Sequence, residues 1–322
     1  MTSAPYIMAL DVGQHSVKAG LVDREGRVNH YYSVQSPAFG DTSPVGKLIA
    51  DACRQVLGRA GLSPRDCAAV GCCTPGSVDP DSGVIVASAT PGWVGVDFRG
   101  PLEEFLGRAV TVESDGAAAA QAAYTFGPAR GKDNLLVVTV GLGISCGLIT
   151  GGEVLRGHGK AALEAGHLPL FARGRPCSCG LRGCWEAHAG GGALWRTLSE
   201  YRAAGQAVPA SAEELARAAA EGNQLALSLW DEQATLLGLG LAALLNVLNP
   251  RTVVLGGGMM KSWALIRKRL LKTARAYALS WNSRAAIVCA PDPERLSLLG
   301  AAVAAARREG LAHFFNDWPW NN

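Results

Sequence analysis

Three cysteines lie within eight residues of one another in the stretch CSCGLRGC: Cys177, Cys179 and Cys184. A structural zinc ion takes four nitrogen or sulfur ligands at the corners of a tetrahedron. Gly180 and Gly183 allow this loop to curl around a single ion. Three free thiols grouped in a loop would oxidise readily, so we expect these cysteines to bind structural zinc.

Spacing leaves the fourth zinc ligand open. His188 follows Cys184 by four residues, which is a common spacing in zinc fingers. His167 precedes Cys177 by ten residues. Spacing alone favours His188 and keeps His167 as the alternative.

Glycine-rich turns follow three apolar segments of the chain: DVG at 11–13, GLG at 141–143 and GGG at 256–258. At such turns backbone N–H groups can approach a phosphate with no side chain in the way. Each turn alone would be an ordinary tight turn, but three together favour a bound nucleotide. Neither the dinucleotide fingerprint nor the Walker pattern is present.

Asp11 stands in the first of these turns. Its carboxylate would repel a phosphate unless Mg²⁺ lay between them. The alternative is an aspartate that hydrogen-bonds to the backbone of its own turn.

Apolar runs and turn residues predict the elements that must position these groups. Strands are expected at 6–13, 16–23, 27–34, 68–76, 83–88, 110–114, 134–143, 252–258 and 284–291, with a hairpin at 145–155. Helices are expected at 43–60, 101–106, 115–124 and 296–308, and over most of 185–249.

An internal repeat organises these elements. DVGQHSVKAGLVDREGRV (11–28) is similar to TVGLGISCGLITGGEV (139–154), and each copy reads as strand, glycine turn and strand. Two copies, each followed by helices and further strands, predict two related α/β domains that face one another. A cleft between such domains is a natural ligand site.

Composition excludes several classes of protein. The length of 322 residues predicts about two domains. No apolar run reaches the roughly 18–20 residues of a transmembrane helix, and no signal peptide is expected. A net charge of +3 is too small to argue for a nucleic-acid or membrane partner. Nine cysteines, an odd number, indicate reduced thiols in a cytoplasmic protein.

The cysteine loop and the residues before it resemble the signature of the ROK family, which is named for repressors, open reading frames and kinases. The family pattern is Glu-x-Gly-His, then Cys-x-Cys-Gly-x-x-Gly-Cys-x-Glu, and the chain carries EAGH at 164–167 and CSCGLRGCWE at 177–186. The similarity continues along the chain. MALDVG resembles the first phosphate motif, VTVESDGAAAA the catalytic segment, VGLGISCGLITGGEVLRG the second phosphate motif and LNPRTVVLGGGM the adenosine motif.

The resemblance implies an ATP-dependent sugar kinase with an α/β, two-domain actin-like ATPase fold, a duplicated ribonuclease H-like fold. It also implies an ATP cleft between the domains and a homodimer. We expect a smaller N-terminal domain over 1–117, which carries part of the sugar site and onto which the stretch 300–322 packs back. A larger domain over 118–300 is expected to carry the zinc loop and the adenosine site.

The resemblance also implies a role for individual residues. Asp115 would be the general base that accepts the proton of the sugar hydroxyl, and His167 would replace His188 as the fourth zinc ligand. The implied sugar contacts are Gly76, Ser114, Glu164, His167 and Glu186. The implied contacts to ATP with Mg²⁺ are Asp11, Gly13, His15, Gly141, Gly143, Gly256, Gly257 and Gly258.

Some positions depart from the family pattern. Ser114 stands where the family has asparagine, and Ala89 and Thr90 stand where many members have another asparagine. Gln14 and His15 replace a common Gly-Thr, and Leu142 replaces the threonine of Gly-Thr-Gly. Losing one buried donor costs about 1–3 kcal/mol, which argues against a simple glucokinase. We therefore expect another hexose, an amino sugar or a cyclitol-like polyol, with His15 as a replacement donor to phosphate.

Two other functions compete with a kinase. The altered phosphate turns also fit a sugar- or nucleotide-binding protein without catalysis. A repressor of the family would carry a helix-turn-helix domain before the first phosphate motif, and Asp11 begins that motif almost at the N-terminus, so we give this function little weight.

Overall fold

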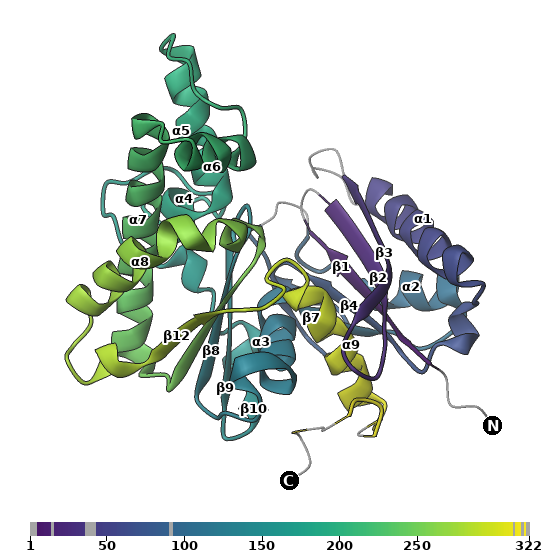
Figure 1. Cartoon of the computed structure of the whole chain (residues 1–322). Coiled ribbons are helices and arrows are strands. Elements are labelled where there is room, and N and C mark those ends of the chain that lie inside the picture. The colour runs from purple at the N-terminus through teal and green to yellow at the C-terminus, as the bar shows by residue number, and fades with distance from the viewer. Residues whose placement is uncertain are drawn as a thin grey trace. The chain divides into compact units, whose positions relative to one another are not determined.

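The structure, a computed structural model, describes residues 5–13, 16–35, 43–89, 93–311, 313–316 and 319, and its architecture is α/β (Figure 1). The strands are β1 (Ile7–Val12), β2 (Ser16–Val22), β3 (Val28–Gln35), β4 (Val70–Thr74), β5 (Ser77–Val78), β6 (Ile85–Ala87), β7 (Thr111–Ser114), β8 (Leu135–Val140), β9 (Ile144–Thr150), β10 (Glu153–Val154), β11 (Thr252–Gly256) and β12 (Ala286–Cys289). The helices are α1 (Ser43–Ala60), α2 (Arg99–Leu106), α3 (Asp115–Thr125), α4 (Trp185–Ala189), α5 (Gly191–Ala203), α6 (Ala212–Ala220), α7 (Gln224–Leu248), α8 (Trp263–Tyr277) and α9 (Leu296–Arg308).

The first sheet has the strand order β3-β2-β1-β4-β7. β1 pairs antiparallel with β2 and parallel with β4, and β4 pairs parallel with β7. Alternate residues of β1 point to opposite faces. Ile7 and Ala9 pack in a core with α9, whereas Met8 and Leu10 pack in a core with α1. Both faces are buried, which explains why β1 is apolar almost throughout.

The second sheet repeats this order as β10-β9-β8-β11-β12. A hairpin pairs β9 with β10, and the strands β8, β11 and β12 are parallel. In each sheet the strand that comes first in the chain lies at the centre. The second and third strands lie on one side of it, and the fourth and fifth on the other. The predicted internal repeat is therefore confirmed as a repeated β-sheet unit.

Helices α3 and α9 pack so closely that only small residues fit at their contacts. A Cβ added to Gly300 would lie 1.8 Å from the carbonyl oxygen of Ala118. One added to Gly71 of β4 would lie 2.0 Å from the carbonyl oxygen of Ala301. The alanine-rich segment is thus a helix buried from Gly116 to Thr125, and its small side chains allow close packing as well as favouring helix.

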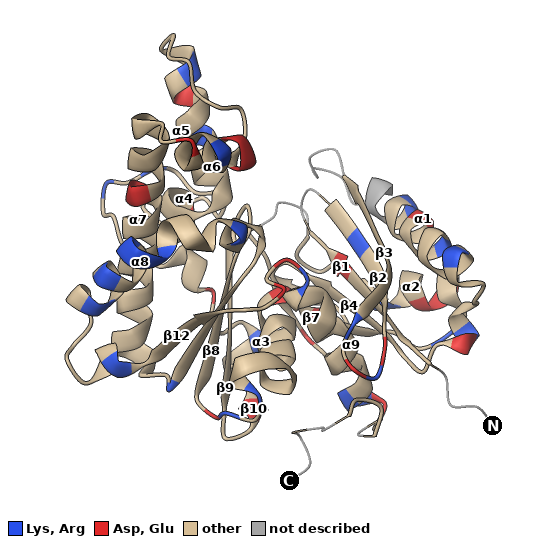
Figure 2. Cartoon of the chain, in the orientation of Figure 1, with Lys and Arg blue, Asp and Glu red and all other residues tan. Residues whose placement is uncertain are grey.

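Helix α8 was not predicted from the sequence. Its buried residues Ile266, Leu270, Thr273 and Ala274 recur at helical spacing and face α7. Lysine and arginine occupy much of its remaining surface (Figure 2). The helical signal was therefore present in the sequence between the predicted strands at 252–258 and 284–291.

The aromatic C-terminal stretch contributes to the core. Phe314 and Phe315 are buried, and the Phe315 ring lies edge-on to Phe126 at 5.2 Å between ring centroids. The Arg24 guanidinium lies over the Phe314 ring at 5.4 Å. Trp318 and Trp320 lie outside the described residues.

By its internal contacts the chain divides into two compact units. Unit 1 comprises residues 1–133, 147–163 and 295–322, and unit 2 comprises residues 134–146 and 164–294. Within the described ranges, no helix combines the length and apolar character needed to cross a bilayer.

Candidate active site and metal centre

The parallel strands of unit 1 bring several predicted site residues to one edge of their sheet. The register pairs Asp11 of β1 with Cys73 of β4, and Thr74 of β4 with Ser114 of β7. All three strands end at this edge, and Asp115 follows at once as the first residue of α3. Ligands of open α/β sheets bind at the carboxyl ends of parallel strands, so this edge is a candidate binding site.

Asp11 forms an ion pair that was not foreseen. The Lys18 Nζ lies 3.0 Å from Asp11 Oδ2, directly opposite on β2, and both side chains are mostly buried. The negative charge of Asp11 raises the pKa of Lys18. The signal in the sequence was a single lysine within the apolar strand SVKAGLV. Asp11 therefore forms an ion pair with a lysine of β2, and this pair partly compensates the negative charge of its carboxylate.

Cys73 lies beside the carboxylate of Asp11. Its Sγ is 3.6 Å from Asp11 Oδ1. Burial raises the pKa of the Cys73 thiol well above its usual value, and the charges of Asp11 and Asp115 raise it further. The thiol is consequently neutral, and Asp11 and Asp115 act on the same small region.

Asp115 is half-buried at the start of α3. Its Oδ1 accepts the Gly116 N–H at 2.7 Å. Ser114 precedes it with an extended backbone and caps the helix without a side-chain hydrogen bond to the helix. The partial positive charge of the helix N-terminus favours an ionised carboxylate at Asp115.

Gly76, another residue of unit 1, is fixed by its backbone. Its φ is +87°, and a Cβ there would lie 2.6 Å from the Ala87 carbonyl oxygen. Glycine is therefore required where β4 passes into the β5–β6 hairpin.

The glycine turns of unit 2 also share one sheet edge. Gly141 follows β8 and Gly256 ends β11, and these strands are parallel with Thr139 paired to Gly256. Gly257 has a φ of +87°, and a Cβ there would lie 2.4 Å from the Val140 carbonyl oxygen. A Cβ on Gly141, by contrast, would meet nothing within 4 Å, and the Gly141 N–H donates to the Gly143 carbonyl oxygen at 3.0 Å.

Glu186 is hydrogen-bonded to the backbone beside the GLG turn at 141–143, the predicted second phosphate motif. It lies in the first turn of α4, and its Oε2 accepts the Ile144 N–H at 2.8 Å. A Cβ on Gly143 would lie 2.3 Å from the same oxygen. The structure thus brings a predicted sugar contact and a predicted phosphate contact together, which the sequence did not indicate.

Four side chains of unit 2 converge as a candidate metal centre: His167, Cys177, Cys179 and Cys184. One ligand atom from each lies within 4.8 Å of all the others. The Cys177 Sγ to His167 Nδ1 distance is 3.5 Å, and the Cys179 Sγ to Cys184 Sγ distance is 3.6 Å. Ligands at about 2.3 Å from zinc in a tetrahedron are about 3.8 Å apart, so this donor set fits zinc.

The loop glycines have separate roles around this centre. Gly180 has a φ of +87° and Gly183 a φ of +79°. A Cβ on Gly183 would lie 1.8 Å from the Phe171 carbonyl oxygen. Both positions therefore favour glycine, as expected for a loop that curls around one ion.

His188, which spacing favoured as the fourth ligand, lies outside the cluster. Its Nε2 accepts the Arg175 N–H at 3.0 Å, and its ring lies against Phe171 at 4.2 Å between centroids. Burial lowers the pKa of His188, and the charges of Arg175 and Arg196 lower it further. The spacing argument was wrong because the chain folds back, so that His167 of the 3₁₀ turn η4 (Ala165–His167) reaches the cysteines.

Two thiols of the cluster hold their protons more strongly than a free cysteine does. Burial, together with the other two cysteines, raises the pKa of Cys184 to about 12. Burial also raises the pKa of Cys177. A metal would displace these protons, because thiolate is the form that coordinates zinc.

The remaining predicted residues are placed only in part. Glu164 is exposed and precedes η4, where its carbonyl oxygen accepts the His167 N–H at 3.0 Å. Gly13 donates its N–H to the Ser16 carbonyl oxygen at 2.8 Å and so closes the first phosphate turn. Gly258 is more open, because a Cβ there would meet only Glu294 Oε1, at 3.7 Å. His15 lies outside the described residues, as does Thr90.

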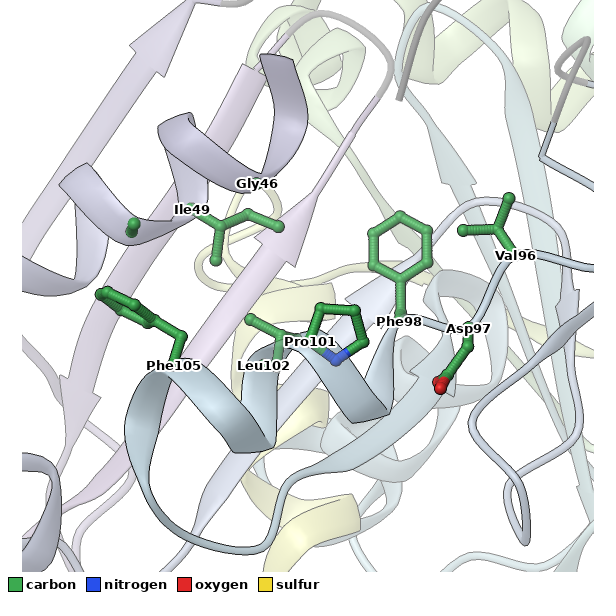
Figure 3. A pocket seen from close by; sticks show the side chains of 9 residues that line it. Gly46, Ile49, Val96, Asp97, Phe98, Pro101, Leu102 and Phe105 are labelled. Carbon is green, nitrogen blue, oxygen red and sulfur yellow. The ribbon is translucent and has the colours of Figure 1, made fainter. Parts of the chain in front are cut away.

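An apolar pocket of unit 1 contains none of these residues. Ile49 of α1 and Leu102, Phe98 and Phe105 of the α2 region line it (Figure 3). Its one charged group, Asp97, accepts hydrogen bonds from the backbone at the start of α2. This pocket is therefore separate from the candidate site.

Comparison with known proteins adds to this geometry. The model of the ROK family matches residues 7–308. A glucokinase of Streptomyces coelicolor is 29% identical over 310 residues, which cover 92% of this chain and 96% of that protein. A ROK family glucokinase from Streptomyces griseus, solved in complex with glucose and AMPPNP, has a TM-score of 0.85 at 27% identity and covers 94% of this chain and 99% of its own. The ROK hexokinase from Thermus thermophilus is 34% identical with a TM-score of 0.71 and the same two shares.

Proposed function

Because the chain belongs to the ROK family, we propose that it is an ATP-dependent sugar kinase in which Asp115 is the general base. Its two matching sheets are the duplicated actin-like ATPase fold expected from the sequence. The likeness to glucokinases over nearly the whole chain supports the enzyme class.

The shared sheet edge of unit 1 carries the proposal. Phosphoryl transfer needs an oriented alcohol, a group that accepts its proton, and cations on the phosphates. Asp11 lies near the end of β1 and Asp115 directly follows β7, and these strands flank β4, which carries Cys73. One carboxylate would accept the hydroxyl proton and the other would hold the cation of the nucleotide.

ATP would be bound through the glycine turns. Gly141 and Gly258 are exposed and carry no side chain, so a phosphate or nucleotide could approach their backbone, and Gly257 packs against Val140 at the end of β8. Asp11 is the carboxylate that would hold Mg²⁺, whose charge allows a polyphosphate to approach. Lys18 reduces the negative charge of Asp11 and so supports the same approach.

The sugar would be held by Glu164, His167, Glu186, Ser114 and the backbone at Gly76. Carboxylates suit vicinal hydroxyls because they accept hydrogen bonds from them. The Nδ1 of His167 faces the cysteines, which leaves Nε2 for a sugar hydroxyl. Zinc with four protein ligands has no open position, so its role would be to fix the orientation of His167.

The substrate is proposed to be a hexose or related polyol that differs from glucose at the position read by Ser114. A serine is shorter than the family's asparagine and offers one donor instead of two. A purified zinc-loaded protein should therefore form ADP fastest with a member of a panel of hexoses, amino sugars and cyclitols other than glucose. If no member of the panel gave ADP, the kinase proposal would be abandoned.

A binding protein without catalysis is the alternative, and the altered phosphate turns favour it. Calorimetry separates the two functions. Tight binding of Mg-ATP supports the kinase, whereas sugar binding with no ATP binding supports the alternative. We further propose that the protein is a homodimer, which sedimentation can test.

A further inference from the structure

Glu113 is a buried carboxylate that receives four hydrogen bonds, two on each oxygen. Its Oε1 accepts the Ser114 N–H at 3.0 Å and Arg156 Nη1 at 2.8 Å. Its Oε2 accepts Gln121 Nε2 at 3.0 Å and Arg156 Nη2 at 2.7 Å. Glu113 is 2% exposed, so these donors replace water around the charge.

We infer that Glu113 and Arg156 form a clamp that positions Asp115 for catalysis. The inference rests on the proposed function, because the clamp acts through the general base. Neither residue is among the proposed contacts to ATP or sugar, so both are positioning residues.

The clamp lies at the point where a strand becomes a helix. Glu113 and Ser114 end β7, Asp115 begins α3, and Gln121 lies further along that helix. Glu113 accepts one bond from the strand side of this junction, from the Ser114 N–H, and one from the helix side, from Gln121. Rotation of α3 relative to β7 would break the bond from Gln121. Asp115 lies between Ser114 and Gln121 in the chain, so its backbone keeps one orientation while the Gln121 bond persists.

Arg156 makes this arrangement specific. Its guanidinium meets the carboxylate with two parallel bonds, a planar geometry that lysine cannot reproduce. It follows the β9–β10 hairpin, so it also ties that hairpin to the catalytic segment. The junction of β7 and α3, where Asp115 lies, is thereby held by bonds from the strand, from the helix and from the residue after the hairpin.

Catalysis is sensitive to such positioning. A general base must lie within hydrogen-bond reach of the proton it accepts. A displacement of about 1 Å can lower the rate by roughly a hundredfold. Loss of the clamp should therefore reduce kcat and leave substrate binding intact.

A purely structural role is the competing explanation, and the pair itself allows a test. Removing one partner of a buried ion pair leaves an uncompensated buried charge, whereas replacing both partners avoids that cost. The double variant Glu113→Gln/Arg156→Met therefore removes the clamp without leaving a buried charge. Arg156→Lys is the conservative variant, since it keeps the charge and loses the second parallel bond.

Asp51→Asn is the matched control. Asp51 is another carboxylate of unit 1 that pairs with an arginine, Arg54, but both side chains of that pair are exposed on α1. Asp115→Asn reports on the base itself. For each variant we would measure kcat, both KM values and the free energy of unfolding in urea.

We expect the double variant to lose about ten- to a hundredfold in kcat, with each KM changed less than about threefold. Arg156→Lys should recover part of the loss, and Asp51→Asn should match the unaltered protein. The clamp is overturned if the double variant keeps full kcat while Asp115→Asn is inactive, or if its activity falls only with the folded fraction. If Asp115→Asn turns over normally, or if the unaltered protein phosphorylates no sugar, the proposed function fails, and the clamp with it.

Discussion

Lys18 and Asp11 form a mostly buried ion pair at the proposed phosphate site. Their atoms lie 3.0 Å apart and both side chains are mostly buried. Lys18→Met leaves the Asp11 carboxylate buried without its partner, which should lower the free energy of unfolding by about 3 kcal/mol. Urea titration measures this. An unchanged unfolding midpoint would show that the pair contributes nothing to stability.

The raised pKa of Lys18 also predicts how the stability difference between the unaltered protein and Lys18→Met depends on pH. A cation whose pKa is higher in the folded state stabilises fully below its unfolded pKa, about 10.4, and this stabilisation is lost only as pH rises through the folded pKa. The stability difference between the unaltered protein and Lys18→Met should therefore be constant from pH 7 to pH 9. A difference that shrank across this range would contradict the ion pair.

The metal centre gives a second prediction at the scale of residues. Cys179→Ser removes one of four converging ligands, so the protein should lose its zinc, become less stable and bind the sugar more weakly. Metal analysis, thermal unfolding and sugar calorimetry would report these three effects. Cys289→Ser is the control, since Cys289 lies outside the cluster. If stability fell while sugar affinity stayed intact, zinc would not set the geometry of the sugar pocket.

Sequence predicted the cysteines of this centre from their spacing, but spacing chose the wrong histidine. Distance along the chain does not report how the loop folds back, and only the family resemblance pointed to His167. The contact of Glu186 with Ile144 was also missed, because it joins segments 42 residues apart in sequence. The zinc ion and the sugar contacts themselves stay predictions.

At the scale of elements, the glycines of the turns differ in whether the local structure could accept a side chain. Gly141→Ala should leave stability nearly unchanged, since its Cβ would meet nothing within 4 Å. The added methyl would face the proposed phosphate site, so the KM for ATP should rise while the KM for sugar stays the same. Steady-state kinetics would show this split. An unchanged KM for ATP would place the nucleotide elsewhere.

Gly257→Ala is the contrasting variant. Its φ of +87° and a Cβ only 2.4 Å from the Val140 carbonyl oxygen should make it destabilising by about 1–3 kcal/mol. Thermal or urea unfolding measures the loss. Normal stability in this variant would mean that the turn can rearrange.

The elements themselves were largely predictable. Strands β1, β2 and β3, the hairpin β9–β10 and helices α1, α3 and α9 occur where apolar periodicity and turn residues indicated. Helix α2 begins two residues before its predicted start at Pro101. Helix α8 was overlooked although its buried residues have helical spacing, because its many basic residues obscured the apolar face.

At the scale of the whole molecule, the internal sequence repeat predicted the two related α/β units. Similarity between 11–28 and 139–154 indicated two related units, and the two sheets have the same strand order. The hydrogen-bonding partners of parallel strands are distant in sequence, so the register that aligns Asp11, Cys73 and Glu113 could not be read in advance. The domain boundary after residue 117 and the homodimer stay predictions.

The central claim is that Asp115 accepts the proton of a sugar hydroxyl during transfer from ATP. The most direct measurement is single-turnover phosphoryl transfer by Asp115→Asn, with zinc and Mg²⁺ present and sugar binding verified by calorimetry. We predict a loss of about 10²- to 10⁴-fold in the rate of transfer with sugar affinity retained. A variant that binds the sugar and transfers phosphate at the unaltered rate would contradict the account.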